Sequence, residues 1–371
     1  MMTTILVGGD VVPTQSNLES FLSGGSLWDQ NLMALRDQAD IAVFNLECPL
    51  TDSDDPIEKC GPCMKAPRNA VKGLCSFRPD AVSLANNHIL DYGPEGIRQT
   101  MEALSANGIL TFGAGSDLDE ADRPLILERN GKKIGFYALA EHEFSYAREN
   151  SPGANPLDLL NLQERIRQIR DACDFLVVLY HGGREHYRYP SPMLQKTCRK
   201  IAVSGADVVL CQHSHCIGSH ETYLGKEILY GQGNFLFDAE DAGESFRTGL
   251  LVRIQIDGDG KSTVEYLPVR TKDGQCVLSE GEEREKTLGD LEVRSGRITD
   301  PQEVERLYQQ YADEYREKMM KVFLNGNCFL KAVNILYGRK PSRVYDRNTK
   351  LAILNSMCCE SLHELMSKVL E

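Results

Sequence analysis

Short apolar runs recur along the first two thirds of the chain, and five of them end on a polar side chain that can bind a metal ion. They are residues 5–10, 41–47, 81–88, 175–181 and 208–215. Apolar runs of this length predict buried β-strands. In open α/β sheets the ligand crevice lies beyond the carboxyl ends of the strands. We therefore expect the polar residues at these ends to converge on one site.

Helical patterns alternate with these runs. Residues 94–107 carry apolar side chains at helical spacing before Gly108, which is typical of a helix end. Residues 159–173 have one apolar and one charged face. Further on, residues 249–256 and 262–269 alternate in hydrophobicity on either side of a glycine-containing turn, which predicts a hairpin. The whole pattern predicts an α/β fold whose sheets are not purely parallel.

The amino-acid composition of the chain changes beyond about Gln275. Residues 279–297 are dense in Glu, Arg and Gly, as in a solvated linker or an exposed helix. One long amphipathic helix is expected from Pro301, and a second from about 348 to 370. We interpret residues 276–371 as an acidic linker and helical subdomain beside a domain of residues 1–275. Alternatively, the apolar stripes of these helices form a homo-oligomer or partner surface.

Composition and charge restrict the function. The 371 residues include 42% hydrophobic and 26% charged residues, which indicates a globular chain with one large domain and an appendage. A net charge of -13 and a pI near 5.2 argue against nucleic-acid binding. We expect neither a signal peptide nor a membrane span, because no basic start precedes an apolar stretch and about 18 consecutive apolar residues never occur. A cytoplasmic location is the corresponding expectation.

Twelve cysteines are scattered through the chain, and we expect reduced thiols. Cys60 and Cys63 form a C-x-x-C pair, but no second pair follows at the spacing of a zinc site. Two free thiols in a loop are the simpler interpretation, and a zinc-binding or redox pair is the alternative.

The polar residues at the run ends have the chemistry of a metal site. Carboxylate, amide and imidazole donors together suit Mn, Fe, Zn or Ni as one or two divalent ions. The candidate ligands are Asp10, Glu47, Asn87, His181, His213 and His215. Two ions need one shared ligand, and the Glu47 carboxylate can bridge them.

Two further residues have the chemistry of proton transfer. His88 follows Asn87 directly and would be placed to protonate a leaving group, and Asp91 could fix its tautomer. The simpler alternatives are that His88 is a buried structural histidine and that Asp10 caps a turn.

Six motifs together resemble a known family. They are Gly9-Asp10, Asn45-Leu-Glu47-Cys-Pro49, Ala85-Asn-Asn87-His88-Ile-Leu-Asp91-Tyr-Gly93, His181-Gly-Gly-Arg-Glu185, the segment 205–215 that ends in His213-Ser-His215, and Tyr230-Gly-Gln-Gly-Asn234-Phe. In order and spacing, over residues 3–269, they resemble the CapA family, which is named for poly-gamma-glutamate capsule biosynthesis. That family is similar to the calcineurin-like metallophosphoesterases. The resemblance implies a two-sheet α/β/β/α sandwich.

The resemblance also implies individual roles. Asp10 and His215 would bind a first metal, Glu47 would bridge, and Asn87, His181 and His213 would bind a second. His88 would act on the leaving group. Asn45, Glu185 and Asn234 would orient the ligands or contact substrate. The metallophosphoesterases begin with Asp-x-His, whereas Val12 stands at that histidine's position here. A site with one metal, or one completed by substrate, is therefore the alternative.

Two hypotheses for function follow. The first is a metal-dependent hydrolase acting on an anionic small molecule or polymer, either at a phosphoester or at an amide of a poly-gamma-glutamate-like chain. The second is a non-catalytic, metal-containing component of polymer synthesis and export, because family membership alone does not establish an activity.

Overall fold

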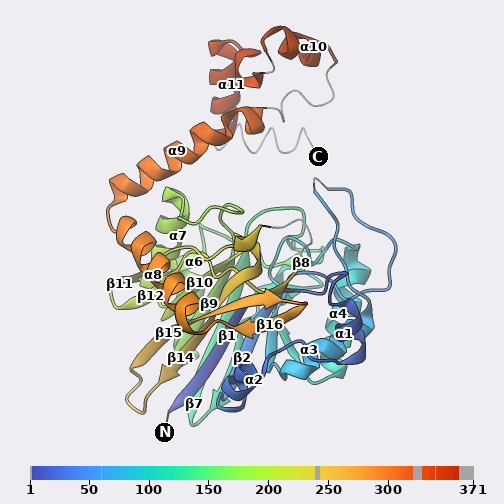
Figure 1. The fold of residues 1–371 in the computed structure, drawn as a ribbon, viewed down its shortest axis with the longest axis vertical. Coiled ribbons are helices and arrows are strands. Elements are labelled where there is room, and N and C mark those ends of the chain that lie inside the picture. The colour runs from blue at the N-terminus through green and yellow to red at the C-terminus, as the bar shows by residue number, and fades with distance from the viewer. Residues whose placement is uncertain (1, 60, 239–242, 321–327, 339, 359–371) are drawn as a thin grey trace. The chain divides into compact units, whose positions relative to one another are not determined.

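The computed structural model describes residues 2–59, 61–238, 243–320, 328–338 and 340–358 (Figure 1). The chain divides into two compact units, Met1–Glu305 and Arg306–Glu371. Residues 276–305, which we expected to belong to the C-terminal part, therefore lie in the first unit. The assignment of domains stays a prediction.

The first sheet is built around the N-terminal strand. β1 pairs in parallel with β2, which continues to β3 and β4, and antiparallel with β14, which continues to β15 and β16. One further strand of this sheet, β13, pairs in parallel with the end of β1. β14 and β15 form the predicted hairpin, which is confirmed. The strands are β1 (Thr3–Val12), β2 (Ile41–Leu46), β3 (Ala81–Ser83), β4 (Leu110–Phe112), β13 (Asn234–Phe237), β14 (Thr248–Ile256), β15 (Ser262–Lys272) and β16 (Gln275–Leu278).

The second sheet has the order β11-β12-β10-β9-β7-β6, with parallel pairing among β12, β10, β9 and β7. Alternate side chains of these strands point to opposite faces. Phe136, Val177 and Leu179 face a core shared with the first sheet, whereas Tyr137 and Val178 belong to a second core. The strands are β6 (Leu125–Arg129), β7 (Lys132–Ala140), β9 (Phe175–His181), β10 (Val208–Gln212), β11 (His220–Tyr223) and β12 (Lys226–Leu229), and β5 (Ala114–Gly115) and β8 (Gly153–Ala154) form a small separate sheet.

Helices cover the outer face of each sheet, so the predicted two-sheet sandwich is confirmed (Figure 1). On the first sheet, Phe77 of α3 packs 6.2 Å from Phe44 of β2 and 5.2 Å from Phe235 of β13, measured between ring centroids. On the second sheet, Ile166 of α6 and Ile201 of α7 lie in the second core. The helices are α1 (Leu18–Ser23), α2 (Gln30–Asp37), α3 (Val71–Phe77), α4 (Gly93–Ala106), α5 (Leu118–Ala121), α6 (Leu162–Asp171) and α7 (Pro192–Ser204).

Residues 279–297 are not a solvated linker. They form α8 (Gly281–Arg297), whose Leu291 is fully buried and whose Glu292 carboxylate lies 3.0 Å from Nε2 of His220 on β11. One side of this helix is therefore part of the first unit, and only the opposite side is exposed as we expected.

The C-terminal helices are α9 (Pro301–Met320), α10 (Cys328–Leu336) and α11 (Arg347–Cys358). The second predicted helix extended to residue 370, and residues 359–371 lie outside the described part of the chain. An oligomer formed through these helices stays a prediction. Among the described residues, no helix combines the length and apolar character needed to cross a bilayer. Cys63 is a free thiol, and Cys60 lies outside the described residues, so a role for that pair also stays a prediction.

Two glycines near the end of β1 allow a close approach to β13. The pairing of β1 with β2 shifts register between Val7 and Asp10, where the two glycines stand. A Cβ on Gly9 would lie 2.1 Å from the Gly233 carbonyl oxygen, and one on Gly8 would lie 2.5 Å from the Phe235 ring. The backbone at this point can therefore carry no side chain.

We predict that Gly9→Ala lowers the free energy of unfolding by about 1–3 kcal/mol, because the added methyl group forces two backbone segments apart. Gly289→Ala is the control, since Gly289 lies within α8 and no atom would lie within 4 Å of its new Cβ. That change should raise stability by up to about 1 kcal/mol. Denaturant titration followed by Trp28 fluorescence measures both effects. Equal midpoints for Gly9→Ala and wild type would refute the role of the close approach.

Candidate metal centre

The predicted ligands meet at the carboxyl ends of strands from both sheets. Asp10 lies in β1, Glu47 follows β2, Asn87 follows β3, and His181 ends β9. His213 and His215 follow β10. All six side chains are buried. The two sheets pack face to face with these strand ends at the same edge, which is how positions up to 205 residues apart in sequence come together.

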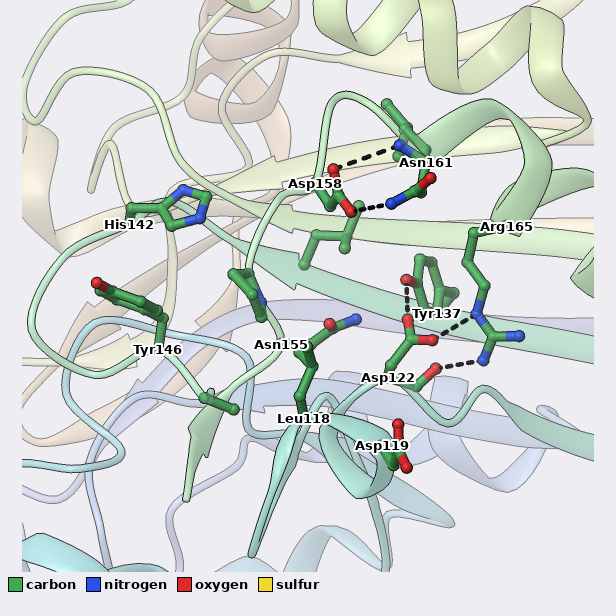
Figure 2. Close-up of a pocket in the computed structure, with 14 residues that line it drawn as sticks. Leu118, Asp119, Asp122, Tyr137, His142, Tyr146, Asn155, Asp158, Asn161 and Arg165 are labelled. Carbon is green, nitrogen blue, oxygen red and sulfur yellow. Dashed lines mark hydrogen bonds and ion pairs between the residues drawn. The ribbon is translucent and has the colours of Figure 1, made fainter. Parts of the chain in front are cut away.

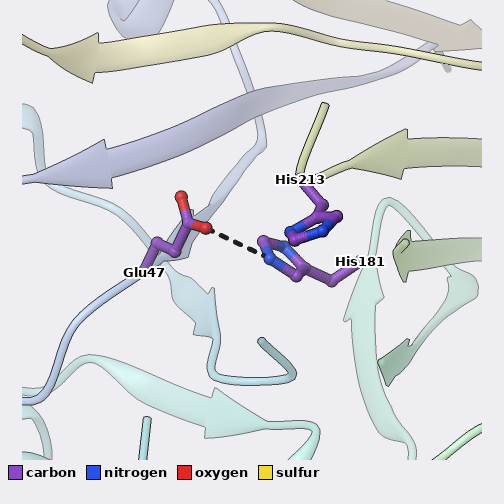
Figure 3. Close-up of side chains that lie close together, drawn as sticks. All are labelled: Glu47, His181 and His213. Atoms are coloured by element: carbon purple, nitrogen blue, oxygen red, sulfur yellow. Dashed lines mark ion pairs between the residues drawn. The ribbon is translucent and has the colours of Figure 1, made fainter. Parts of the chain in front are cut away.

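The donor atoms form two groups that share Glu47. One atom each from Glu47, His181 and His213 lie within 4.8 Å of one another, and the same holds for Asp10, Glu47 and His215. Figure 3 shows the first group, with the Glu47 carboxylate directed at the His181 ring. The distance from Glu47 Oε1 to His181 Nε2 is 3.2 Å, and the distance to His215 Nε2 is 3.8 Å. The geometry can therefore hold one or two ions, with Glu47 as the common ligand.

Asn87 faces the first group as well. Its Oδ1 lies 3.0 Å from His181 Nε2, the same nitrogen that faces Glu47. Its amide nitrogen donates to Glu143 Oε2 at 3.0 Å, which directs the oxygen towards the cluster. Glu143 also lies 3.8 Å from His213 Nε2. We did not predict Glu143, although the apolar run that becomes β7 is followed by Glu141-His-Glu143 and thus carries the same signal as the other strand ends.

The Glu47 carboxylate shows that the pocket fits a cation. The residue is fully buried, and neither oxygen accepts a hydrogen bond from the residues that the structure describes. Burial, and next the charge of Asp10, raise the pKa of Glu47 well above its usual range. A buried carboxylate without hydrogen-bond partners is strongly unfavourable unless a positive charge compensates it. A divalent ion would supply that charge.

Two of the three histidines, His181 and His213, are in the neutral form that binds metals. Burial lowers the pKa of His181 to about 4, and burial together with His181 lowers the pKa of His213 well below its usual range. Both rings are therefore neutral at pH 7, as metal ligation requires. Burial also acts to lower the pKa of His215, but the Glu47 and Asp10 carboxylates outweigh it and raise that pKa.

A left-handed backbone brings His213 and His215 to the same side. Their φ angles are +81° and +50°, in a region that non-glycine residues seldom adopt. Alternate residues of a regular strand would point to opposite faces. Backbone strain of this kind is typical of functional sites.

Two asparagines, Asn45 and Asn234, form hydrogen bonds with candidate ligands. Asn45 Nδ2 donates to Asp10 Oδ1 at 2.8 Å. Asn234 Oδ1 lies 3.0 Å from His215 Nδ1, so a proton on that nitrogen leaves Nε2 free to bind a metal. Glu185 is half-buried and forms no hydrogen bond with the described residues, but its charge acts on Glu47 and His215.

His88 and Asp91 form a hydrogen-bonded pair beside the cluster. His88 Nδ1 lies 2.7 Å from Asp91 Oδ2, which also accepts from the Met64 amide at 2.7 Å. The other oxygen of Asp91 pairs with the ammonium group of Lys59, whose side chain is only 3% exposed. Lys59 comes from an irregular loop, and nothing in its sequence context separates it from a surface lysine.

A cavity of about 430 Å³ lies apart from this cluster (Figure 2). Three of its charged groups, Asp122, Asp158 and Arg165, already have protein partners. Arg165 forms an ion pair with Asp122 at 2.6 Å, and Asp158 accepts from Asn161 Nδ2 at 2.7 Å. No residue of the two metal-donor groups lines this cavity. This cavity is therefore separate from the two donor groups.

Comparison with known proteins gives consistent matches. Residues 4–239 match the family described as bacterial capsule synthesis protein PGA_cap. The chain is 28% identical over 241 residues to the PGA biosynthesis protein CapA of Bacillus subtilis, covering 62% of this chain and 61% of that protein. It is 30% identical over 263 residues to a probable polyglutamine synthesis accessory protein of Mycobacterium tuberculosis, covering 66% and 69%. The crystal structure of a phosphatase from Mycoplasma pneumoniae aligns with a TM-score of 0.47 and 13% identity over 77% of this chain and 97% of that chain.

We predict that Glu47→Gln removes metal from both donor groups, whereas His213→Ala affects only the group that contains His181. The affinity of an affected group should fall by at least about 10–100-fold, the range found when even a supporting residue of a metal site is changed. Elemental analysis after reconstitution with manganese and gel filtration measures this. His142→Ala is the control, because His142 belongs to neither group. Equal metal content in all four proteins would contradict the assignment.

Proposed function

This chain belongs to the bacterial capsule synthesis protein family PGA_cap, and we propose that within this family it is a metal-dependent hydrolase acting in poly-gamma-glutamate or related capsule-polymer metabolism. The observation that carries the proposal is the buried Glu47 carboxylate, shared by two donor groups and without a hydrogen-bond partner among the described residues. A structural carboxylate would be expected to have such partners.

In this proposal, one set of residues binds the metal ions and another transfers a proton. Asp10, Glu47, Asn87, His181, His213 and His215 would hold the ions. Divalent ions in such a site supply an activated water and polarise a phosphoryl or carbonyl oxygen. Asn45 and Asn234 keep Asp10 and His215 oriented towards the cluster.

His88 is the proposed general acid. Asp91 accepts the Nδ1 proton of His88, which fixes the orientation of the ring and leaves Nε2 to carry a proton to the leaving group. Lys59 pairs with the opposite oxygen of Asp91 and so holds that carboxylate in place. Lys59 also donates to the backbone carbonyl oxygen of Asn87 at 3.3 Å, and its Nζ lies 3.2 Å from His88 Nδ1. These contacts hold the acid and its partner in place, so we assign Lys59 a positioning role.

A non-catalytic role in polymer assembly is the second candidate. The matched relative from M. tuberculosis is named a probable synthesis accessory protein, and this chain spans only 61% of the B. subtilis CapA protein. Under this alternative the same residues hold a structural metal, and binding occurs without turnover.

The deciding experiment is an activity screen of the manganese-reconstituted protein. Its substrates are p-nitrophenyl phosphate, bis(p-nitrophenyl) phosphate and a gamma-linked glutamate oligomer, because metal ions polarise phosphoryl and amide oxygens alike. We expect turnover of at least one class, lost in Glu47→Gln and kept in His142→Ala. Bound metal in wild type without turnover of any substrate would reject hydrolysis and support the assembly role.

We predict that His88→Ala lowers kcat by about 10²–10⁴-fold for esters with a poor leaving group, since a general acid contributes that much. Esters of p-nitrophenol should lose far less, because p-nitrophenolate leaves without a proton. Metal content should be unchanged. An equal loss for both kinds of ester would mean that His88 acts otherwise than as the acid.

Lys59→Met should show the same dependence on the leaving group as His88→Ala, but with a smaller loss in kcat and with KM unchanged. Steady-state kinetics on the same two kinds of ester measures this. Lys59→Arg keeps the positive charge beside Asp91 and should recover part of the rate. A loss in Lys59→Met that does not depend on the leaving group would indicate a structural role only.

A further inference from the structure

A second cavity, of about 240 Å³, lies between α8 and the short helix η2 (Glu244–Arg247). Three basic side chains and three hydroxyl side chains take part in its lining, namely Arg188, Lys286, Arg294, Ser245, Thr248 and Thr287. Guanidinium, ammonium and hydroxyl groups together are the donors that bind carboxylates and phosphates. The chain as a whole carries a net charge of -13, so such a group is unusual on this molecule.

The basic groups in this cavity form no ion pair with the described residues. Arg188 and Lys286 form no ion pair or hydrogen bond within the described part of the chain. Arg294 donates to the Gly218 carbonyl oxygen at 2.8 Å but pairs with no described carboxylate. Burial, and next the charge of Arg188, lower the pKa of Arg294, so the two guanidinium groups are close enough to repel each other.

The acidic residues of the lining offset this charge only in part. Glu244 and Glu283 both pair with Arg270, at 2.9 and 2.8 Å. Asp290 remains, and its charge acts on Arg294 without forming an ion pair among the described residues. With Arg270 included, four basic groups face three carboxylates, which leaves a net charge of +1. An anion would relieve the repulsion between the two arginines and satisfy their unused donors.

Two residues of the cavity lining are close in sequence to rings that pack against His215. Arg188 follows two residues after His186, whose ring centroid lies 6.3 Å from that of His215. Ser245 precedes Phe246, whose ring lies 5.0 Å from His215. Short segments thus connect the cavity lining to residues packed against a candidate ligand.

We propose that this cavity binds an oxyanion, a carboxylate or a phosphate, that belongs to the substrate of the metal centre. The link to catalysis rests on the proposed function, whereas anion binding does not. The substrate is accordingly a compound with a second anionic group beyond the bond that is cleaved, as in a polyanionic chain. A substrate with a single charged group would leave the cavity unused.

Binding to the metal-free protein tests the cavity separately from the metal centre. The full chain is treated with chelator, and isothermal titration calorimetry measures the affinity for inorganic phosphate and for a gamma-linked glutamate tetramer at fixed ionic strength. Arg188→Met is the main variant, because Arg188 forms no hydrogen bond or ion pair with the described residues that the change would break. We expect a weakening of about 10-fold or more for Arg188→Met, and more for the double variant with Arg294→Met, as for lost charge-assisted hydrogen bonds. Arg123→Met, an exposed arginine outside the cavity, is the control.

The outcomes separate this inference from the proposed hydrolase activity. Unchanged affinity in the double variant, or an equal loss in Arg123→Met, overturns the anion site whether or not the protein is an enzyme. A specific loss supports the site even if the protein turns over nothing. The tighter of the two ligands identifies the carboxylate or the phosphate as the natural group. If the protein is active, Arg188→Met should raise KM for a substrate with a second anionic group, leave kcat unchanged, and leave the kinetics of p-nitrophenyl phosphate unaltered.

Discussion

The carboxylate of Glu47 imposes the main physical constraint on this molecule. It is fully buried and accepts no hydrogen bond from any described residue, although burial of an ionised group is among the most unfavourable events in folding. Several features around Glu47 are consistent with a site that compensates this buried charge with a bound cation. The neutral rings of His181 and His213 share one donor group with Glu47, and Asp10 in the other group is held by Asn45. The arrangement of these groups thus suits a bound cation.

The sandwich explains how such a site is assembled. Two sheets share one core, and their parallel strands end at the same edge, so each ligand needs only to follow a buried strand. The close approach of β1 and β13 at Gly9 brings Asp10 level with Asn234, which in turn holds His215. The backbone geometry of the glycines and the orientation of the ligands are therefore parts of one arrangement.

Much of this arrangement could be predicted from sequence, because it depends on local patterns. Apolar runs ending in Asp10, His181 or His213 mark both the strands and the polar groups at their ends. Glu143 carried the same signal and was overlooked. Lys59 could not be predicted, since its role depends on the path of an irregular loop over Asp91. The cavity beside α8 could not be predicted from sequence for a related reason. The sequence of a charged helix resembles that of a solvated segment, and only the structure shows which residues of the sheet it contacts.

At His213 and His215, which have positive φ angles, the residue that gives the most stable backbone is not the residue that can bind a metal. Glycine would relieve the strain at either position, by about 1–3 kcal/mol, yet it has no ring to offer a metal. Laboratory evolution of this chain for heat resistance alone would therefore favour glycine at these positions. The fold would become more stable, and the candidate metal ligands would be lost. Screens for robust variants need to include metal retention among their criteria, or they will enrich an inert protein.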